Sequence, residues 1–433
     1  MKPWIVAAAL LFLPAVIRAQ IVVDADFLTR GEIRKGGLAS EELTGEDGET
    51  LPPGYDFAGF IIERSRLSLQ YGGDDLKAKL TAQHSGTWGS REGGSLNIYE
   101  AWFQYGWKGL FAKVGRQNLS YDDQRIFGSD DWSMTGMTHD VLKIGYEGFG
   151  HKLHLFAAYN QNAENMNGGS WFSGGLQPYK AMEAVWYHYD VPRFPLGASL
   201  LFMNVGMQGG KKAVSEVTYQ QQLVGTYVSF TPKTWSLEAA YYRQMGKEES
   251  GLPIAAWMAS AKGTLSFIPH FTFYGGYDYL SGDESFSVPD PGNIGMPRHE
   301  TVRGFSSIYG SHHKFYGAMD FFYVTTYYGG FTPGLQNLFA GVKWTPGNLT
   351  LDASYHYLST ATKLENAAGR ALGHEGEFSA SYAFRKYIRL SAGVSLMRGT
   401  ETMERLKRSS DKHSLSWAWL MLTVSPTIFS SGR

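Results

Sequence analysis

The chain has 433 residues with a formal net charge of −1, 52 glycines, no cysteine, 15% aromatic residues and only 18% charged residues. An average soluble domain has about 25% charged residues, and a chain without cysteine can form no disulfide, lipid-linked thiol or thiolate metal site. The lack of a basic excess also argues against nucleic acid as a partner.

The first residues, MKPWIVAAALLFLPAVIRAQ, have the layout of a secretory signal peptide. Lys2 precedes an apolar run, and Ala19 is the small residue before the expected cleavage site. A membrane anchor is the alternative, but the run is shorter than the ~20 apolar residues that span a bilayer, and Pro14 interrupts it. We predict that residues 1–19 are removed and that residues 20–433 are exported without a helical anchor.

From residue 21 onward the sequence alternates polar and apolar residues in segments of about 10 to 14 residues, as β-strands do. Eight short breaks with turn chemistry lie near Gly72, Trp107, Glu147, Asp190, Thr231, Ile268, Thr345 and Phe384. They alternate with longer breaks at residues 35–57, 87–95, 120–138, 160–179, 207–216, 246–253, 281–333, 361–374 and 399–413. Short turns on one side and long loops on the other are typical of an outer-membrane barrel, here of about 18 strands.

The two sides of each strand differ in character. In residues 64–83, RSRLSLQYGGDDLKAKLTAQ, Leu67 and Leu69 share one side of a strand, while Arg64 and Arg66 share the other. A soluble sandwich would need a second sheet to cover the apolar side, whereas lipid covers it without one. The fold class that we predict is all-β, a transmembrane antiparallel up-and-down β-barrel formed by residues 20–433.

The barrel must close on itself, because hydrocarbon cannot satisfy unpaired backbone N–H and C=O groups. The first strand, near residues 24–34, should therefore pair with the last, near residues 414–429. About 18 strands are too many for side chains to fill the interior, so we expect a water-filled lumen.

The polar side of the strands should line this lumen and determine which solutes enter it. One interpretation is a conduit whose basic residues attract anions; the other is a hydrated wall of paired charges with little selectivity. The basic residues are Arg30, Arg34, Arg64, Arg66, Lys77, Lys79, Lys113, Lys143, Lys152, Lys262, Lys343 and Arg389; the counter-charges are Asp24, Asp26, Glu32, Glu100, Glu238, Asp278, Asp352 and Glu377.

Two long breaks, residues 120–138 and 281–333, mix aromatic and charged residues and are candidates to fold into the lumen. They could equally be extracellular loops held by aromatic clusters. His312 and His313 are adjacent and so project differently, which disfavours a metal site. No sequence signature marks a nucleophile, base and orienting group, and we expect neither an enzyme nor a cofactor.

Three blocks resemble the alginate export family of outer-membrane β-barrels: GRQNLSYDDQRIFGSDDWSMTG at residues 115–136, DYLSGD at 278–283 and YGSHHKFYGAMDFF at 309–322. The resemblance implies a monomeric 18-stranded barrel with an electropositive lumen for an anionic polysaccharide. It also implies pore-mouth roles for Arg116, Gln117, Asp123, Gln124, Arg125, Asp131 and Trp132. His312, His313 and Lys314, in the break at 281–333, are further pore-mouth candidates. Arg116 falls on the apolar side of its strand, and a bulge at Gly115 would turn it inward.

The function that we expect is passive passage of hydrophilic, preferably anionic or polysaccharide-type solutes across the outer membrane of a Gram-negative bacterium. The alternative is a structural or accessory barrel that binds a partner without conducting. The expected partners are outer-membrane lipid, the solute and possible periplasmic or outer-membrane proteins.

Overall fold

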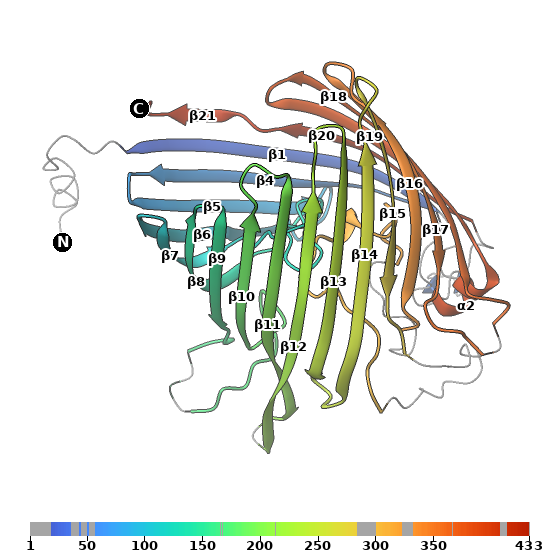
Figure 1. The fold of residues 1–433 in the computed structure, drawn as a ribbon, viewed down its shortest axis with the longest axis horizontal. Helices are drawn as coiled ribbons and strands as arrows, with labels where there is room; N and C mark the ends of the chain where they lie inside the picture. Colours follow the sequence, from blue (N-terminus) through green and yellow to red (C-terminus); the bar gives the residue numbers. More distant parts are fainter. Residues whose placement is uncertain are drawn as a thin grey trace, which may run out of the picture.

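The computed structural model describes residues 19–35, 43–44, 50–51, 57–164, 166, 168–212, 214–283, 300–322, 332–365, 367–407 and 414–432. Most of these residues belong to strands of one closed antiparallel sheet (Figure 1). Nearly all of the predicted signal peptide, and most of the break at 35–57, lie outside the described residues.

Eighteen strands form the barrel, which agrees with the predicted number. They are β1 (Gln20–Lys35), β4 (Ala58–Gly72), β5 (Leu76–Thr87), β6 (Ser95–Trp107), β7 (Leu110–Gln117), β8 (His139–Gly148), β9 (His151–Tyr159), β10 (Ala181–Asp190), β11 (Leu196–Lys211), β12 (Ser215–Phe230), β13 (Trp235–Lys247), β14 (Pro253–Leu265), β15 (Phe271–Leu280), β16 (Leu335–Trp344), β17 (Leu349–Ser359), β18 (Ala371–Arg385), β19 (Ile388–Gly399) and β20 (Ser414–Val424). The short β21 (Thr427–Ser430) continues β20 along β1. Four further elements are not part of the barrel sheet: β2 (Leu43–Thr44), β3 (Thr50–Leu51), the 3-10 helix η1 (His312–Lys314) and α2 (Glu401–Lys407).

The sheet closes between the first and last strands, as predicted. β1 pairs with β4 on one side and with β20 on the other, where the ladder runs from Phe27 opposite Val424 to Lys35 opposite Ser416. Every barrel strand therefore has two neighbours, which leaves no edge with unpaired backbone groups. No helix in the described part of the chain is long and apolar enough to cross a membrane.

All eight predicted short turns are confirmed, and they lie between strands at one end of the barrel. Gly109 shows why their chemistry matters: its φ is +85°, and a Cβ there would lie 2.6 Å from the carbonyl oxygen of Glu147. One predicted long break, residues 207–216, is wrong. β11 and β12 stay paired as far as Lys211 opposite Ser215, with Gly210 at φ +77° within the ladder, so only residues 212–214 lie between the strands.

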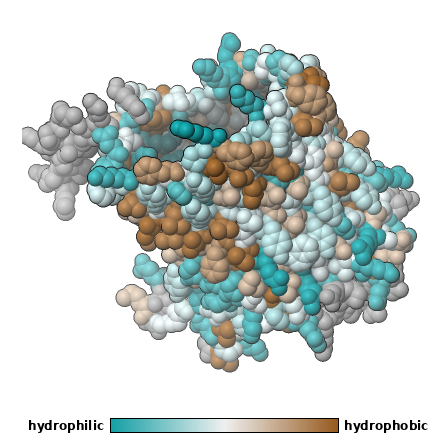
Figure 2. Space-filling model, viewed as in Figure 1, coloured by the Kyte–Doolittle hydropathy of each residue, from teal (hydrophilic) through white to brown (hydrophobic). Residues whose placement is uncertain are grey.

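The side-chain pattern gives the wall an apolar outer face. Leu67 and Leu69 point outward and are 54% and 50% exposed, whereas Arg64 on the inner side of β4 is 4% exposed. Figure 2 shows hydrophobic side chains gathered on the visible wall, with hydrophilic side chains toward the rims. This arrangement suits a cylinder surrounded by lipid.

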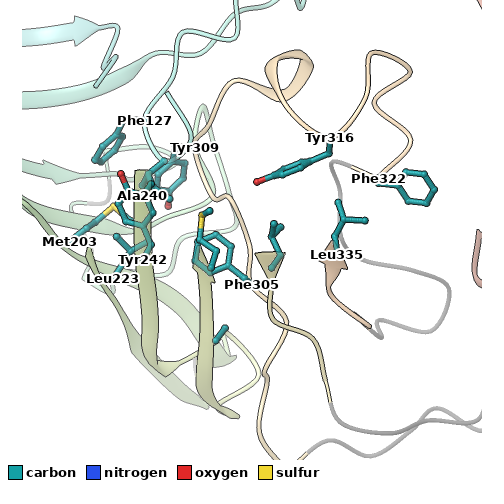
Figure 3. Close-up of a cluster of buried hydrophobic side chains, with 14 of the residues drawn as sticks. Phe127, Met203, Leu223, Ala240, Tyr242, Phe305, Tyr309, Tyr316, Phe322 and Leu335 are labelled. Carbon is teal, nitrogen blue, oxygen red and sulfur yellow. The ribbon is translucent and has the colours of Figure 1, made fainter. Parts of the chain in front are cut away.

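A compact apolar core lies inside the barrel and not within the wall. Inward side chains of β11 to β13, such as Met203, Leu223 and Tyr242, pack against Phe127 and Tyr309 of two loops that fold into the lumen (Figure 3). The two loop rings stack with centroids 6.0 Å apart. The expected water-filled lumen is therefore partly occupied by the chain's own loops, because one sector of the inner wall is apolar.

Candidate functional site

The loop between β7 and β8, residues 118–138, is held against the inner wall by arginines. Arg64 donates to the carbonyl oxygen of Asp131 at 2.9 Å, and Arg66 pairs with the Asp131 carboxylate, also at 2.9 Å. Arg30 donates to the carbonyl oxygen of Trp132 at 2.9 Å. Three arginines that were expected to meet the solute are thus engaged in docking this loop.

Trp132 joins that loop to a second inward loop, residues 300–322. The guanidinium of Arg30 lies 4.0 Å from the centre of the indole, and the His313 ring stacks on the indole at 3.9 Å with an interplanar angle of 11°. His313 in turn bonds to Asp320 at 3.0 Å. The stacked side chains of Arg30, Trp132 and His313 therefore connect β1 to both loops.

Arg125 forms a second connection between the two loops and the wall. It is 6% exposed and pairs with Asp123 of its own loop and with Asp278 of β15, each at 3.1 Å. It also donates to the Tyr316 hydroxyl at 2.8 Å and lies 4.1 Å over the Phe315 ring. Because one buried cation serves four partners, this side chain fixes the position of both loops.

Two carboxylates of β18 hold the second loop from the opposite wall. Glu375 accepts a hydrogen bond from the backbone N–H of Met319 at 2.9 Å, and Glu377 accepts one from Ala318 at 2.6 Å. Gly317 allows this approach, because its φ is +95° and a Cβ there would lie 2.3 Å from a Glu375 oxygen. Glu377, which we predicted as a counter-charge in the lumen, thus also anchors a loop.

The docked loops leave a cavity of about 670 Å³ between themselves and the wall from β12 to β20. Its lining mixes both signs of charge, and Lys343 pairs with Asp352 across neighbouring strands at 3.1 Å. Its charged lining residues are Asp122, Asp123, Arg125, Glu238, Lys262, Asp278, Lys314, Lys343, Asp352 and Glu377.

A second cavity of about 490 Å³ lies on the other side of the first loop. Asp122 and Tyr227 line both cavities, so the loop tip separates them. The second cavity presents two lysines together with three large aromatic residues; its lining is Asn118, Ser120, Tyr121, Asp122, Lys143, Lys152, His154, Trp186, His188 and Tyr227. Ammonium groups next to rings suit a solute that combines negative charge with a flat or apolar face.

Hydrogen-bonded chains fix the loop tip in this second cavity. The Tyr121 hydroxyl bonds to Nδ1 of His154 at 2.9 Å, and Nε2 of His154 bonds to Glu147 at 3.0 Å. The next residue, Asp122, accepts hydrogen bonds from Ser199 and from the Trp186 indole. Burial raises the pKa of Asp122, while the bond from Ser199 opposes that change.

Five lysines of β5, β7, β8 and β9 form a basic stretch of the inner wall. Lys77 and Lys113 both pair with Gln104 of β6, and Lys113 also lies opposite Lys143 in β8. Lys113 lies 3.6 Å over the Trp102 ring. Lys79 pairs with Glu100 at 2.5 Å and Lys152 with Asp190 at 3.1 Å, which completes the group of Lys77, Lys79, Lys113, Lys143 and Lys152. We call this group the lysine row.

The remaining predicted residues belong neither to the lysine row nor to the arginine contacts described above. Arg34 pairs with Glu32 at 2.9 Å, and Arg389 bonds to Ser381 near the turn end of β19. The other pore-mouth residues pack among the loops. Gln117 is buried and donates to the Val141 carbonyl, Gln124 accepts from Ser311, and Lys314 donates to the Asp123 carbonyl. Burial lowers the pKa of Lys314. The side chain of His312 lies outside the described part of the structure.

Arg116 does not face the lumen. It lies opposite Ala101 on the outer side of β7 and forms a bidentate ion pair with Asp140 at 2.9 and 2.8 Å. The expected inward turn at Gly115 does not occur, because the register shift lies in β6 next to Tyr99. Gly115 instead allows close approach, since a Cβ there would lie 2.2 Å from the Ala101 carbonyl oxygen.

The apolar residues that receive the inward loops were missed by the sequence reasoning. They include Met182, Met203, Leu223, Ala256 and Met258, all essentially inaccessible to solvent. A signal was present: residues 196–205, LGASLLFMNV, are apolar on both faces of the strand. A strand that is apolar on both faces indicates that protein covers the side that lipid does not.

Comparisons with known proteins agree with this architecture. The family model described as Alginate export matches residues 73–413. Among solved structures, Pseudomonas aeruginosa OpdL is similar, with a TM-score of 0.60 and 13% identity over 94% of this chain and 99% of that chain. P. aeruginosa OccK3 (OpdO) has a TM-score of 0.57 and 12% identity, covering 94% and 96% of the two chains.

P. aeruginosa OpdK, solved with vanillate, also has a TM-score of 0.57 and 12% identity, over 94% of this chain and 98% of that chain. A comparison with curated proteins finds no match. At such identities the structural likeness shows the fold, a closed antiparallel barrel.

Proposed function

The chain belongs to the alginate export family and is an outer-membrane channel, and from this premise we propose that it passes small anionic solutes passively through the two cavities beside its inward loops. The observation that carries the proposal is the lysine row, whose side chains lie on the inner side of the wall and of which Lys143 and Lys152 line the second cavity. A ring of like charge near a constriction attracts ions of the opposite sign and repels the others.

The paired charges near the two loops support this assignment of roles. Arg30, Arg64 and Arg66 already have partners in the first loop, so they are poorly placed to exchange partners with a passing solute. Within the lysine row, Lys113 lies over the Trp102 ring and forms no ion pair with a described residue, and Lys77 is exposed. Selectivity in this proposal therefore comes from lysines, and the arginines keep the pore narrow.

The size of the cavities favours a monomeric solute or one extended polysaccharide chain. Cavities of about 670 and 490 Å³ are of the size that holds a drug-like or monosaccharide-sized molecule. OpdK was solved with vanillate, an aromatic carboxylate, and the Tyr121 and Trp186 rings beside Lys143 and Lys152 offer the same two chemical features. A carboxylate on a sugar or aromatic ring is the solute class that we propose; an acidic polysaccharide would have to pass as one extended chain.

Planar-bilayer recording of the purified mature chain tests the proposal. In a potassium chloride gradient, we expect single-channel steps whose reversal potential corresponds to a chloride over potassium permeability ratio of at least about 2. Replacing chloride by glucuronate should keep an anion current, whereas glucose at the same concentration should leave the reversal potential unchanged. Cation preference would contradict the anionic solute, and a complete lack of conductance would favour an accessory barrel that binds a partner.

A further inference from the structure

The outer face of β16 to β20 carries charge of only one sign. The outward positions follow from the ladders, in which Tyr357 lies opposite His374, His374 opposite Arg398, and Arg398 opposite Ser414. His374 and Arg398 are the basic side chains in this outward column, and the acidic residues Glu375 and Glu377 of β18 face inward onto the second loop. Within the described residues, no outward position of these five strands holds a carboxylate.

His374 is held in a fixed orientation by two tyrosines. The Tyr355 hydroxyl bonds to Nδ1 of His374, and the Tyr357 ring lies against the imidazole with centroids 5.1 Å apart. A hydroxyl that donates to Nδ1 leaves the proton of the neutral imidazole on Nε2, which then serves as a donor. The neighbouring Arg398 is exposed, and no acidic group in the described part of the chain lies within ion-pair distance of it.

The height of this pair on the wall corresponds to a lipid headgroup. From His374 and Arg398 toward the short turns, the outward positions hold Phe378 and Leu396, which are 47% and 60% exposed, and Val394. Tyr382 ends the apolar stretch near the short-turn side. An outer-membrane barrel carries an apolar band of about 25 Å flanked by aromatic residues at both interfaces, so His374 and Arg398 mark the loop-side interface, where the outer leaflet presents its headgroups.

We propose that His374 and Arg398, supported by Tyr355 and Tyr357, bind a phosphate group of a phosphorylated glycolipid in the outer leaflet. Arginine offers two parallel N–H donors that match phosphate oxygens, and Nε2 of His374 adds a third. Phe378 and Leu396 below the donors contact the acyl chains of the same lipid. Because no described outward carboxylate of β16 to β20 competes, these two side chains can bind an anion.

Another outward arginine serves as an internal control. Arg116 lies on the outer face of β7, but its bidentate pairing with Asp140 at 2.9 and 2.8 Å neutralises it. A phosphate would have to displace a carboxylate there. The two outward arginines thus differ in whether an acidic side chain pairs with them in the described residues.

Native mass spectrometry of the detergent-solubilised mature chain tests the proposal with diphosphorylated lipid A as the probe. The double variant Arg398→Gln, His374→Gln should reduce the bound fraction at least about tenfold, since the two ligands of the phosphate are lost. The control Arg116→Gln should bind like the wild type. Because His374 and Arg398 are exposed and Arg116 is only half-buried, heat-modifiable electrophoretic mobility should confirm a folded barrel in every variant.

Removing the phosphates from the same lipid should lower binding to the wild type to the level of the double variant. Equal retention of diphosphorylated lipid A by the wild type and the double variant would overturn the proposal. Binding of dephosphorylated lipid A as strong as that of the phosphorylated form would overturn it as well. If phosphatidylglycerol displaced lipid A at equal concentration, the site would recognise any anionic lipid, and the assignment to a phosphorylated glycolipid would be wrong.

Discussion

Replacing residues 120–137 of the first inward loop by a short glycine-serine linker is expected to raise the single-channel conductance at least about threefold, since conductance follows the narrowest cross-section of a pore. This loop separates the two cavities through Asp122, and the apolar core of the lumen includes its Phe127. Its removal would merge the two cavities into one wide passage. Planar-bilayer recording of the variant beside the wild type measures the effect.

A matched control is available in the loop between β9 and β10. Residues 160–180 form a loop of similar length that lies beyond the lower ends of β9 and β10 in Figure 1. Shortening it by residues 163–174 should leave the conductance near the wild-type value, because Phe172 and its neighbours contact Gln208 on β11 and do not line either cavity. Equal conductance of the wild type and the variant lacking residues 120–137 would show that the first loop does not obstruct the path.

Reversing the charge of three lysines should invert the ion preference of the channel. In the variant Lys77→Glu, Lys79→Glu, Lys113→Glu, three inward ammonium groups of the lysine row become carboxylates. We expect the reversal potential in a potassium chloride gradient to change sign, with little change in conductance, because none of the three contacts an inward loop in the described residues. Planar-bilayer recording gives both quantities in one experiment.

The comparison variant is Arg64→Glu, Arg66→Glu, which carries the same kind of charge reversal in the neighbouring strand. These arginines hold Asp131 and the backbone of the first loop, so their reversal should release the loop. We expect higher and noisier conductance as its main effect. If the arginine variant changed only the ion preference and the lysine variant only the conductance, the roles assigned to the two groups would be the reverse of those proposed here.

Most of the fold could be predicted from the sequence because the membrane imposes strict rules. A strand in lipid needs two paired neighbours and one apolar face, so the period-2 pattern and the turn residues near Gly72 or Thr345 fix the strand number and the wall. The error at residues 207–216 has a local cause. Gly209 and Gly210 read as loop residues, but both remain in the paired ladder of β11 and β12.

The site was less predictable, because a strand pattern gives the face of a residue and not its partner. Arg64 and Lys77 have the same sequence signature, an inward basic side chain, yet only Arg64 meets a loop that arrives from residues 118–138. The loop's path depends on contacts between distant segments, such as Arg125 with Tyr316. Arg116 shows the opposite case. The family motif predicts a pore-mouth position for it, but its register opposite Ala101 places it on the outer face of the sheet.

The arrangement also indicates how stability and permeation are divided within the lumen. The apolar core around Met203 and Tyr309 removes large side chains from water and fixes one flank of the two loops. The charged contacts of Arg30, Arg64 and Arg125 fix the other flank. In the proposed function, solutes pass through the two cavities and along the lysine row.

The central claim is that inward-facing side chains beside the docked loops line a conducting aqueous path, and thiol modification during recording tests it most directly. The chain has no cysteine, so Lys143→Cys and its outward neighbour Leu142→Cys each introduce a single thiol. Lys143 lines the second cavity, whereas Leu142 is 40% exposed on the lipid-facing side. We predict that a membrane-impermeant thiosulfonate lowers the current in steps for Lys143→Cys and leaves Leu142→Cys unchanged. Equal responses of the two variants, or a block only in Leu142→Cys, would contradict the account.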